Sequence, residues 1–147
     1  MREVTEPIQA IIAERDYPMQ LLETAREMIT RGRFEVAVVT CQMACEISVE
    51  RVLRTYFRVK TLTHLESAIG DLLPSYNLAN DKVRKLYTAM TDDSVQREYF
   101  WAEYKTMVSL RNKAVHAGSR IQESQAQMVI RIAASVVNHL SRVESKA

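Results

Sequence analysis

Residues 33–58, RFEVAVVTCQMACEISVERVLRTYFR, are the longest apolar stretch of the chain and decide its fold class. Apolar side chains recur at helical spacing along one face of this stretch, and others cover much of the remaining surface. We therefore predict a long helix that is buried on most sides. A helix of this kind packs against several neighbours within one chain or against a partner chain.

The rest of the chain has the composition of an all-helical protein. Only three glycines and three prolines occur in 147 residues, which leaves room for few turns and argues against a β-sandwich. We predict an up-and-down four-helix bundle with short accessory helices, a single domain over residues 1–147 whose core spans about 18–143. Helices are expected at residues 18–31, 33–58, 62–73, 95–116 and 120–143.

Charge and cysteine content limit the cellular compartments and the binding partners that the sequence allows. The net charge of +2 permits a nucleic-acid partner without demanding one. Residues 1–17 carry too many charges for a signal peptide, and no apolar run reaches the length of a membrane span. Cys41 and Cys45 lie on one helical face and are expected to be reduced core residues, not metal ligands. These features predict a cytoplasmic protein with no membrane partner and no bound metal.

The most reactive side chains gather in residues 111–118, RNKAVHAG, at the expected end of a helix that Gly118 would close. Asn112 and His116 are four positions apart and share a face. Arg111 and His116 are five apart, so about 140° separates them on an ideal helix. A flexible arginine, a frayed helix end or a second chain across a two-fold axis can bring them together. The alternative is a solvated helix end whose cations suit the helix dipole.

The chemistry that Arg111 and His116 can perform is narrow. Arginine offers a fixed, charged fork for phosphate oxygens, and histidine takes or gives a proton near neutral pH. The sequence has no acidic cluster for Mg²⁺, no phosphate-binding glycine loop and no nucleophile elbow. What remains is RNA cleavage without a metal or other cofactor, in which the 2′-hydroxyl attacks the neighbouring phosphate. Because one histidine cannot easily act as both base and acid, a dimeric site is attractive.

The arrangement resembles the HEPN superfamily (higher eukaryotes and prokaryotes nucleotide-binding domains). The resemblance rests on Arg-x4-His in the penultimate helix of a short helical chain, with Asn112 directly after Arg111. It implies a homodimer whose two motifs form a metal-independent endoribonuclease of a toxin–antitoxin, abortive-infection or other defence system, with Arg111, Asn112 and His116 as catalytic residues. An antitoxin or nucleotidyltransferase is then a possible partner. One family subgroup carries a modified tyrosine two residues after the histidine, where this chain has Gly118, which argues against that form of regulation.

Three further residues are candidates for contact with the substrate. Lys113 and Arg120 add positive charge around the motif, although both can also be simply solvated. Glu46 belongs to a polar stripe at i, i+4 and i+8 with Gln42 and Glu50. In one interpretation the stripe is a solvated seam. In the other it faces the motif, where Glu46 orients the arginine or the histidine by a charge-assisted hydrogen bond.

Two other groups of side chains are predicted to lie outside the site. His139 is expected at the surface or rim of the last helix. The aromatic residues of 99–104 are expected in the core or in a dimer interface, because a base-stacking surface alternates more strongly with cations.

A second function stays open at this stage. The chain also suits a non-catalytic HEPN-like module that binds a nucleotide or a protein, because fold does not fix function. The apolar helix of 33–58 favours this alternative, since it suggests a large subunit interface.

Overall fold

The computed structural model describes residues 17–116 and 120–147, and within these ranges every regular element is helical. This confirms the predicted all-α class. A first helix covers residues 17–30. The elements that follow are α2 (Phe34–Val59), α3 (Thr63–Leu72), α4 (Asp81–Thr91), the short 3₁₀ helix η1 (Val95–Arg97), α5 (Trp101–His116) and α6 (Glu123–Ser145).

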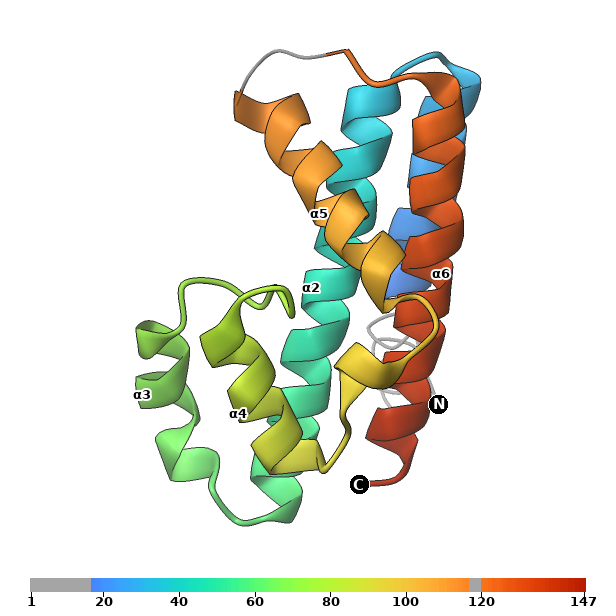
Figure 1. Ribbon diagram of the computed structural model, residues 1–147. Helices are drawn as coiled ribbons and strands as arrows, with labels where there is room; N and C mark the ends of the chain where they lie inside the picture. Colours follow the sequence, from blue (N-terminus) through green and yellow to red (C-terminus); the bar gives the residue numbers. More distant parts are fainter. Residues whose placement is uncertain (1–16, 117–119) are drawn as a thin grey trace, which may run out of the picture.

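The long helix α2 is the centre of the bundle. Figure 1 shows α6 running beside α2 in the same direction, with α5 crossing diagonally over the upper half and α3 and α4 packed against the lower half. The helix of residues 17–30 completes the bundle. Because α2 touches all of these neighbours, side chains around most of its circumference are buried, as the sequence predicted.

The turn into α2 depends on glycine. Gly32 has a φ of +73°, a left-handed conformation that costs an L side chain energy. Its N–H donates to the carbonyl of Ile29 at 3.0 Å, and Arg33 donates to Met28 at 2.8 Å, so the last carbonyls of the first helix are satisfied.

The helix that carries the motif begins later than predicted. Residues 95–116 were expected to form one helix, but η1 ends at Arg97, Glu98 is extended, and α5 starts at Trp101. Val95 and Phe100 are both buried, and on one continuous helix they would point about 140° apart. The break allows both side chains to enter the core.

The expectation for His139 was wrong. The residue is buried, with 8% of its surface exposed, and Nε2 lies 2.8 Å from Oδ2 of Asp93. Tyr87 donates its hydroxyl to the same oxygen at 2.6 Å, and the edge of Phe100 packs on the imidazole with ring centroids 5.6 Å apart. This Tyr87–Asp93–His139 network ties the connection between α4 and α5 to α6.

Candidate functional site

The motif lies at one end of the bundle. Figure 1 shows the end of α5 at the same end as the beginnings of α2 and α6. Gly118, the predicted cap of the motif helix, lies outside the described residues. Lys113 and His116 stand in the last turn of α5, where cations are favoured by the helix dipole.

Arg111 continues the inward face of α5. Tyr104, Met107 and Arg111 follow one another at intervals of three and four residues, and the first two are fully buried. The arginine itself is half-buried, and its Nε is buried without a hydrogen-bond partner among the described residues. Its Nη1 donates to Oδ1 of Asn112 at 3.3 Å. The guanidinium therefore extends from the contact with α2 towards the surface.

His116 lies on a different side of the same helix. Both His116 and Asn112 are exposed, whereas Arg111 is half-buried. The five-residue spacing between Arg111 and His116 places them about 140° apart around α5. Within one subunit the fold thus brings Arg111 together with Asn112 but leaves His116 facing solvent.

The polar stripe of α2 lies against the side of α5 that carries Arg111, along part of the length of the stripe. Gln42 is only 2% exposed, and Glu46 is half-buried. Desolvation raises the pKa of Glu46, while the guanidinium of Arg111 and then the amide of Gln42 oppose that rise. One turn further on, Glu50 reaches the surface and pairs with Arg54 at 3.3 Å. The stripe is therefore a solvated seam only at its far end.

The two basic candidates remain at the surface. Lys113 and Arg120 are both exposed. Glu35, in the first turn of α2, accepts a hydrogen bond from the backbone N–H of Ile121 at 2.9 Å. This bond is the main reason that the pKa of Glu35 is lowered, and the charge of Arg120 adds to the effect. Arg120 is thereby placed near the start of α2.

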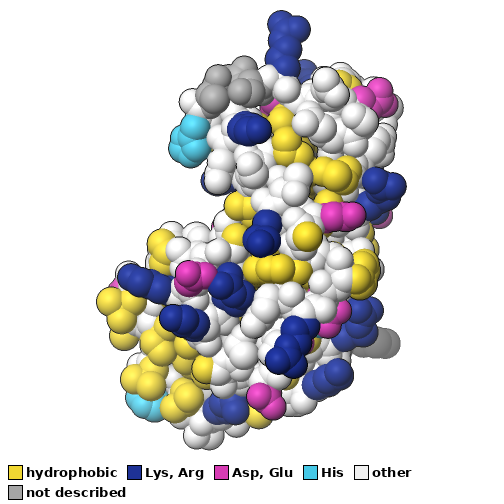
Figure 2. Space-filling model, viewed as in Figure 1, with side chains coloured by type: hydrophobic (Ala, Val, Ile, Leu, Met, Phe, Trp, Pro, Cys, Tyr) yellow, Lys and Arg dark blue, Asp and Glu magenta, His cyan; other side chains and the backbone are white. Residues whose placement is uncertain are grey.

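Three exposed apolar side chains lie on α5, the helix of the motif, and on its neighbour α2. They are Val36 and Met43, seven positions apart on α2, and Val115 on α5, each between 44% and 49% exposed. We call these three residues the apolar patch. Figure 2 shows hydrophobic side chains among lysines and arginines on the face where α5 lies, with a hollow between this upper part and the part formed by α3 and α4. Exposed apolar residues next to a charged site are typical of interaction surfaces.

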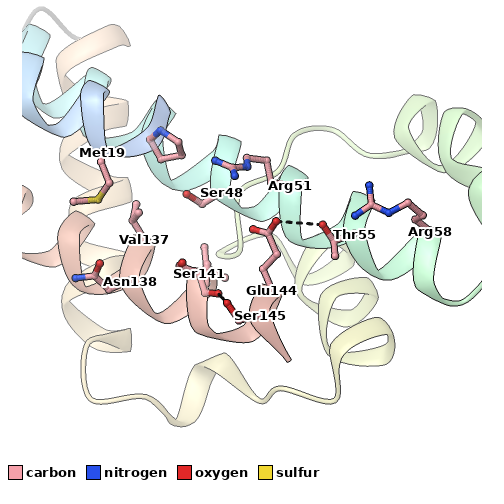
Figure 3. Close-up of a pocket in the computed structure, with 12 residues that line it drawn as sticks. Met19, Ser48, Arg51, Thr55, Arg58, Val137, Asn138, Ser141, Glu144 and Ser145 are labelled. Carbon is pink, nitrogen blue, oxygen red and sulfur yellow. Dashed lines mark hydrogen bonds between the residues drawn. The ribbon is translucent and has the colours of Figure 1, made fainter. Parts of the chain in front are cut away.

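One groove among the described residues lies away from the motif. It has a volume of about 430 Å³ and runs between the first helix, α2 and α6. Figure 3 shows Arg51 and Arg58 on its α2 side and Glu144 on its α6 side, where Thr55 and Glu144 are hydrogen-bonded at 3.3 Å. None of the motif residues lines this groove, so its size alone does not make it the reactive site.

One group of side chains has the composition of a metal site. Potential ligand atoms of Asp93, Glu98 and His139 lie within 4.8 Å of one another. Asp93 and His139 are already hydrogen-bonded to each other, and Tyr87 occupies the same carboxylate oxygen. These bonds occupy Oδ2 of Asp93 and Nε2 of His139, and we assign the Tyr87–Asp93–His139 network a structural role.

The fold agrees with a family comparison. The sequence model of the HEPN domain matches residues 19–143, and the chain belongs to the HEPN family. Searches of curated proteins and of solved structures found no match. None of the described helices combines the length and apolar character that a membrane crossing requires.

Proposed function

We propose that this protein is a metal-independent endoribonuclease of a toxin–antitoxin or defence-type system. The observation that carries the proposal is Arg111, Asn112 and His116 at the end of α5 in a HEPN bundle. Membership of a family with nucleotide-binding and ribonuclease-type roles supports it.

Each residue of the motif has a distinct role in the proposed reaction. His116 accepts a proton from the 2′-hydroxyl of the substrate or donates one to the leaving oxygen. Arg111 stabilises the negative charge that develops on the phosphorane, and Asn112 holds its Nη1. Lys113 and Arg120 bind neighbouring phosphates of the RNA.

The proposed enzyme works as a homodimer. One exposed imidazole per subunit, on a different side of α5 from Arg111, makes an incomplete site. A second copy that docks on the apolar patch supplies the other guanidinium and imidazole. The exposure of Val36, Met43 and Val115 supports this arrangement, because a two-fold interface uses the same surface of both chains.

The first experiment measures RNA cleavage in the presence of EDTA. We expect the wild type to cleave RNA, leaving a 2′,3′-cyclic phosphate, and not to cleave a substrate with a deoxyribose at the reactive position. His116→Ala is expected to lower the rate by about 10²–10⁴-fold, the usual contribution of a general acid or base. His64→Ala is the matched control, because His64 is exposed at the start of α3. Equal rates for the wild type and His116→Ala would refute the proposal.

The second experiment tests the dimer. Met43→Glu places a charge in the apolar patch, and we expect it to give a monomer in sedimentation and to abolish cleavage. Mixing inactive Arg111→Ala with inactive His116→Ala should restore part of the activity, since a mixed dimer retains one guanidinium and one imidazole. A monomeric wild type that cleaves RNA would contradict the composite site.

A non-catalytic binding module is the second candidate. The buried Nε of Arg111 favours it, because an arginine turned towards α2 suits a structural or phosphate-holding role. In this case the protein would not cleave RNA but would co-purify with a defined protein or nucleotide. Expression in cells separates the two functions. A ribonuclease toxin should arrest growth when the wild type is expressed but not when His116→Ala is expressed, whereas a binding module should show no such difference.

A further inference from the structure

Three polar side chains, Gln42, Glu46 and Arg111, lie where α2 crosses α5, and two of them, Gln42 and Arg111, have buried atoms without a hydrogen-bond partner among the described residues. Gln42 is 2% exposed, and neither its Nε2 nor its Oε1 makes a hydrogen bond to the described residues. The same holds for the buried Nε of Arg111. Glu46 lies one turn after Gln42 on α2. Unpaired polar groups in a low-dielectric contact are costly, so their presence in one place calls for an explanation.

The charges of this contact are coupled. The carboxylate of Glu46 is half-buried, and Arg111 is the opposite charge that acts on it. No ion pair within 4.0 Å joins them among the described residues. The amide of Gln42 acts on both Glu46 and Tyr104 without meeting the geometry of a hydrogen bond. Cys45, the remaining titratable neighbour, also experiences the charge of Glu46.

We propose that Glu46 is the positioning residue for Arg111. Its ionised carboxylate attracts the Nε side of the guanidinium into the contact between α2 and α5, and this leaves the Nη groups at the surface, where Asn112 already holds Nη1. Gln42 limits the orientations that the carboxylate can take. The inference rests on the proposed function, because the surface side of the guanidinium is the side that would bind the reacting phosphate.

Of the roles that the sequence left open for Glu46, this one assigns it to Arg111 and not to His116 or to the substrate. A carboxylate repels phosphate, and Glu46 is half-buried and experiences the charge of Arg111. An anion behind a phosphate-binding arginine fixes the direction of its fork without competing for the phosphate.

The test compares Glu46→Gln and Glu46→Asp with the wild type. Glu46→Gln keeps the size of the side chain and removes its charge, whereas Glu46→Asp keeps the charge. Glu50→Gln is the matched control, since Glu50 is the next residue of the stripe but pairs at the surface with Arg54. We expect Glu46→Gln to lower kcat by about 10²-fold with KM nearly unchanged, the effect of a small displacement of a catalytic group. Glu46→Asp should recover part of the loss, and Glu50→Gln should match the wild type.

Two pH-dependent measurements separate positioning from simple destabilisation. On the acid side, the activity of the wild type should fall further than that of Glu46→Gln, because only the wild type loses the charge of Glu46 by protonation. In proton–nitrogen correlation NMR spectra, the Nε–H signal of Arg111, assigned with Arg111→Lys, should move as Glu46 takes up a proton. That movement should be absent in Glu46→Gln.

The outcomes distinguish this inference from the proposed function. If His116→Ala abolishes cleavage but Glu46→Gln behaves like Glu50→Gln, the enzyme stands and the positioning role of Glu46 is refuted. If the wild type does not cleave RNA, the proposed function fails. The Nε–H signal of Arg111 then decides alone. A pH-dependent movement that is present in the wild type and absent in Glu46→Gln supports the positioning of Arg111, and the same behaviour in both proteins overturns it.

Discussion

Replacement of His139 by alanine should substantially destabilise the fold. The imidazole bonds to a carboxylate at 2.8 Å and packs edge-on against Phe100. A hydrogen bond to a charged group contributes about 1.5–3 kcal/mol, and an aromatic pair adds about 0.5–1.5 kcal/mol. We therefore expect His139→Ala to lower the free energy of unfolding by about 2–4 kcal/mol. For a chain of 147 residues this corresponds to a fall in Tm of roughly 5–15 °C.

Urea unfolding followed by far-UV circular dichroism at neutral pH measures this loss. Tyr87→Phe removes the other donor to Asp93, and the double variant with His139→Ala gives the coupling between the two donors. His64→Ala, in an exposed position, is the control and should change stability by less than about 0.5 kcal/mol. A cost of less than about 1 kcal/mol for His139→Ala would show that the hydrogen bonds of this network contribute little net stability.

Four further predictions concern buried or charged side chains. Burial raises the pKa of Cys41 to about 12, and that of Cys45 well above its usual value, so iodoacetamide should label neither thiol in the folded protein and both after denaturation, as mass spectrometry can show. The pKa of Glu35 is lowered in the folded state, so the stability that this carboxylate contributes is present above its ordinary pKa of 4.5 and is lost as the pH falls through the folded value. The free energy of unfolding of Glu35→Gln should therefore fall less on acidification than that of the wild type. Tyr104→Phe removes two hydrogen bonds to the loop before α4 and should cost about 1–3 kcal/mol in urea unfolding. Gln42→Met removes two unpaired buried atoms and should stabilise the fold by about 1–3 kcal/mol while lowering cleavage.

The fold class was predictable because it depends on repeated local signals. The apolar faces of α2 and α6 recur along more than twenty residues each, and no single substitution would hide them. The position of the motif at the end of α5 followed from the same periodicity. The start of α5 did not, because the spacing of Val95 and Tyr99 fits a helix. Packing against the rest of the core buries Phe100 and leaves Tyr99 80% exposed, and the local sequence does not show this packing.

Contacts between distant parts of the chain were harder to predict. His139 reads as a surface residue in its own helix, because its partner Asp93 lies 46 positions earlier in a loop. The stripe of Gln42 and Glu46 gave a partial signal, since its spacing predicted one face but not which neighbour would cover that face. The structure supplies this neighbour, Arg111, through the crossing of α5 over α2.

The burial of Gln42 bears on why such a stripe persists in an otherwise apolar helix. An amide without partners in a buried contact costs about 1–3 kcal/mol, and methionine would fill a similar volume without that cost. Residues that lower stability in this way are expected mainly at functional sites. Glu46 and Arg111 occupy the same contact, so the cost is concentrated where the charge of the motif arginine must be oriented. The polar contact between α2 and α5 is therefore better explained by the chemistry of Arg111 than by the stability of the bundle.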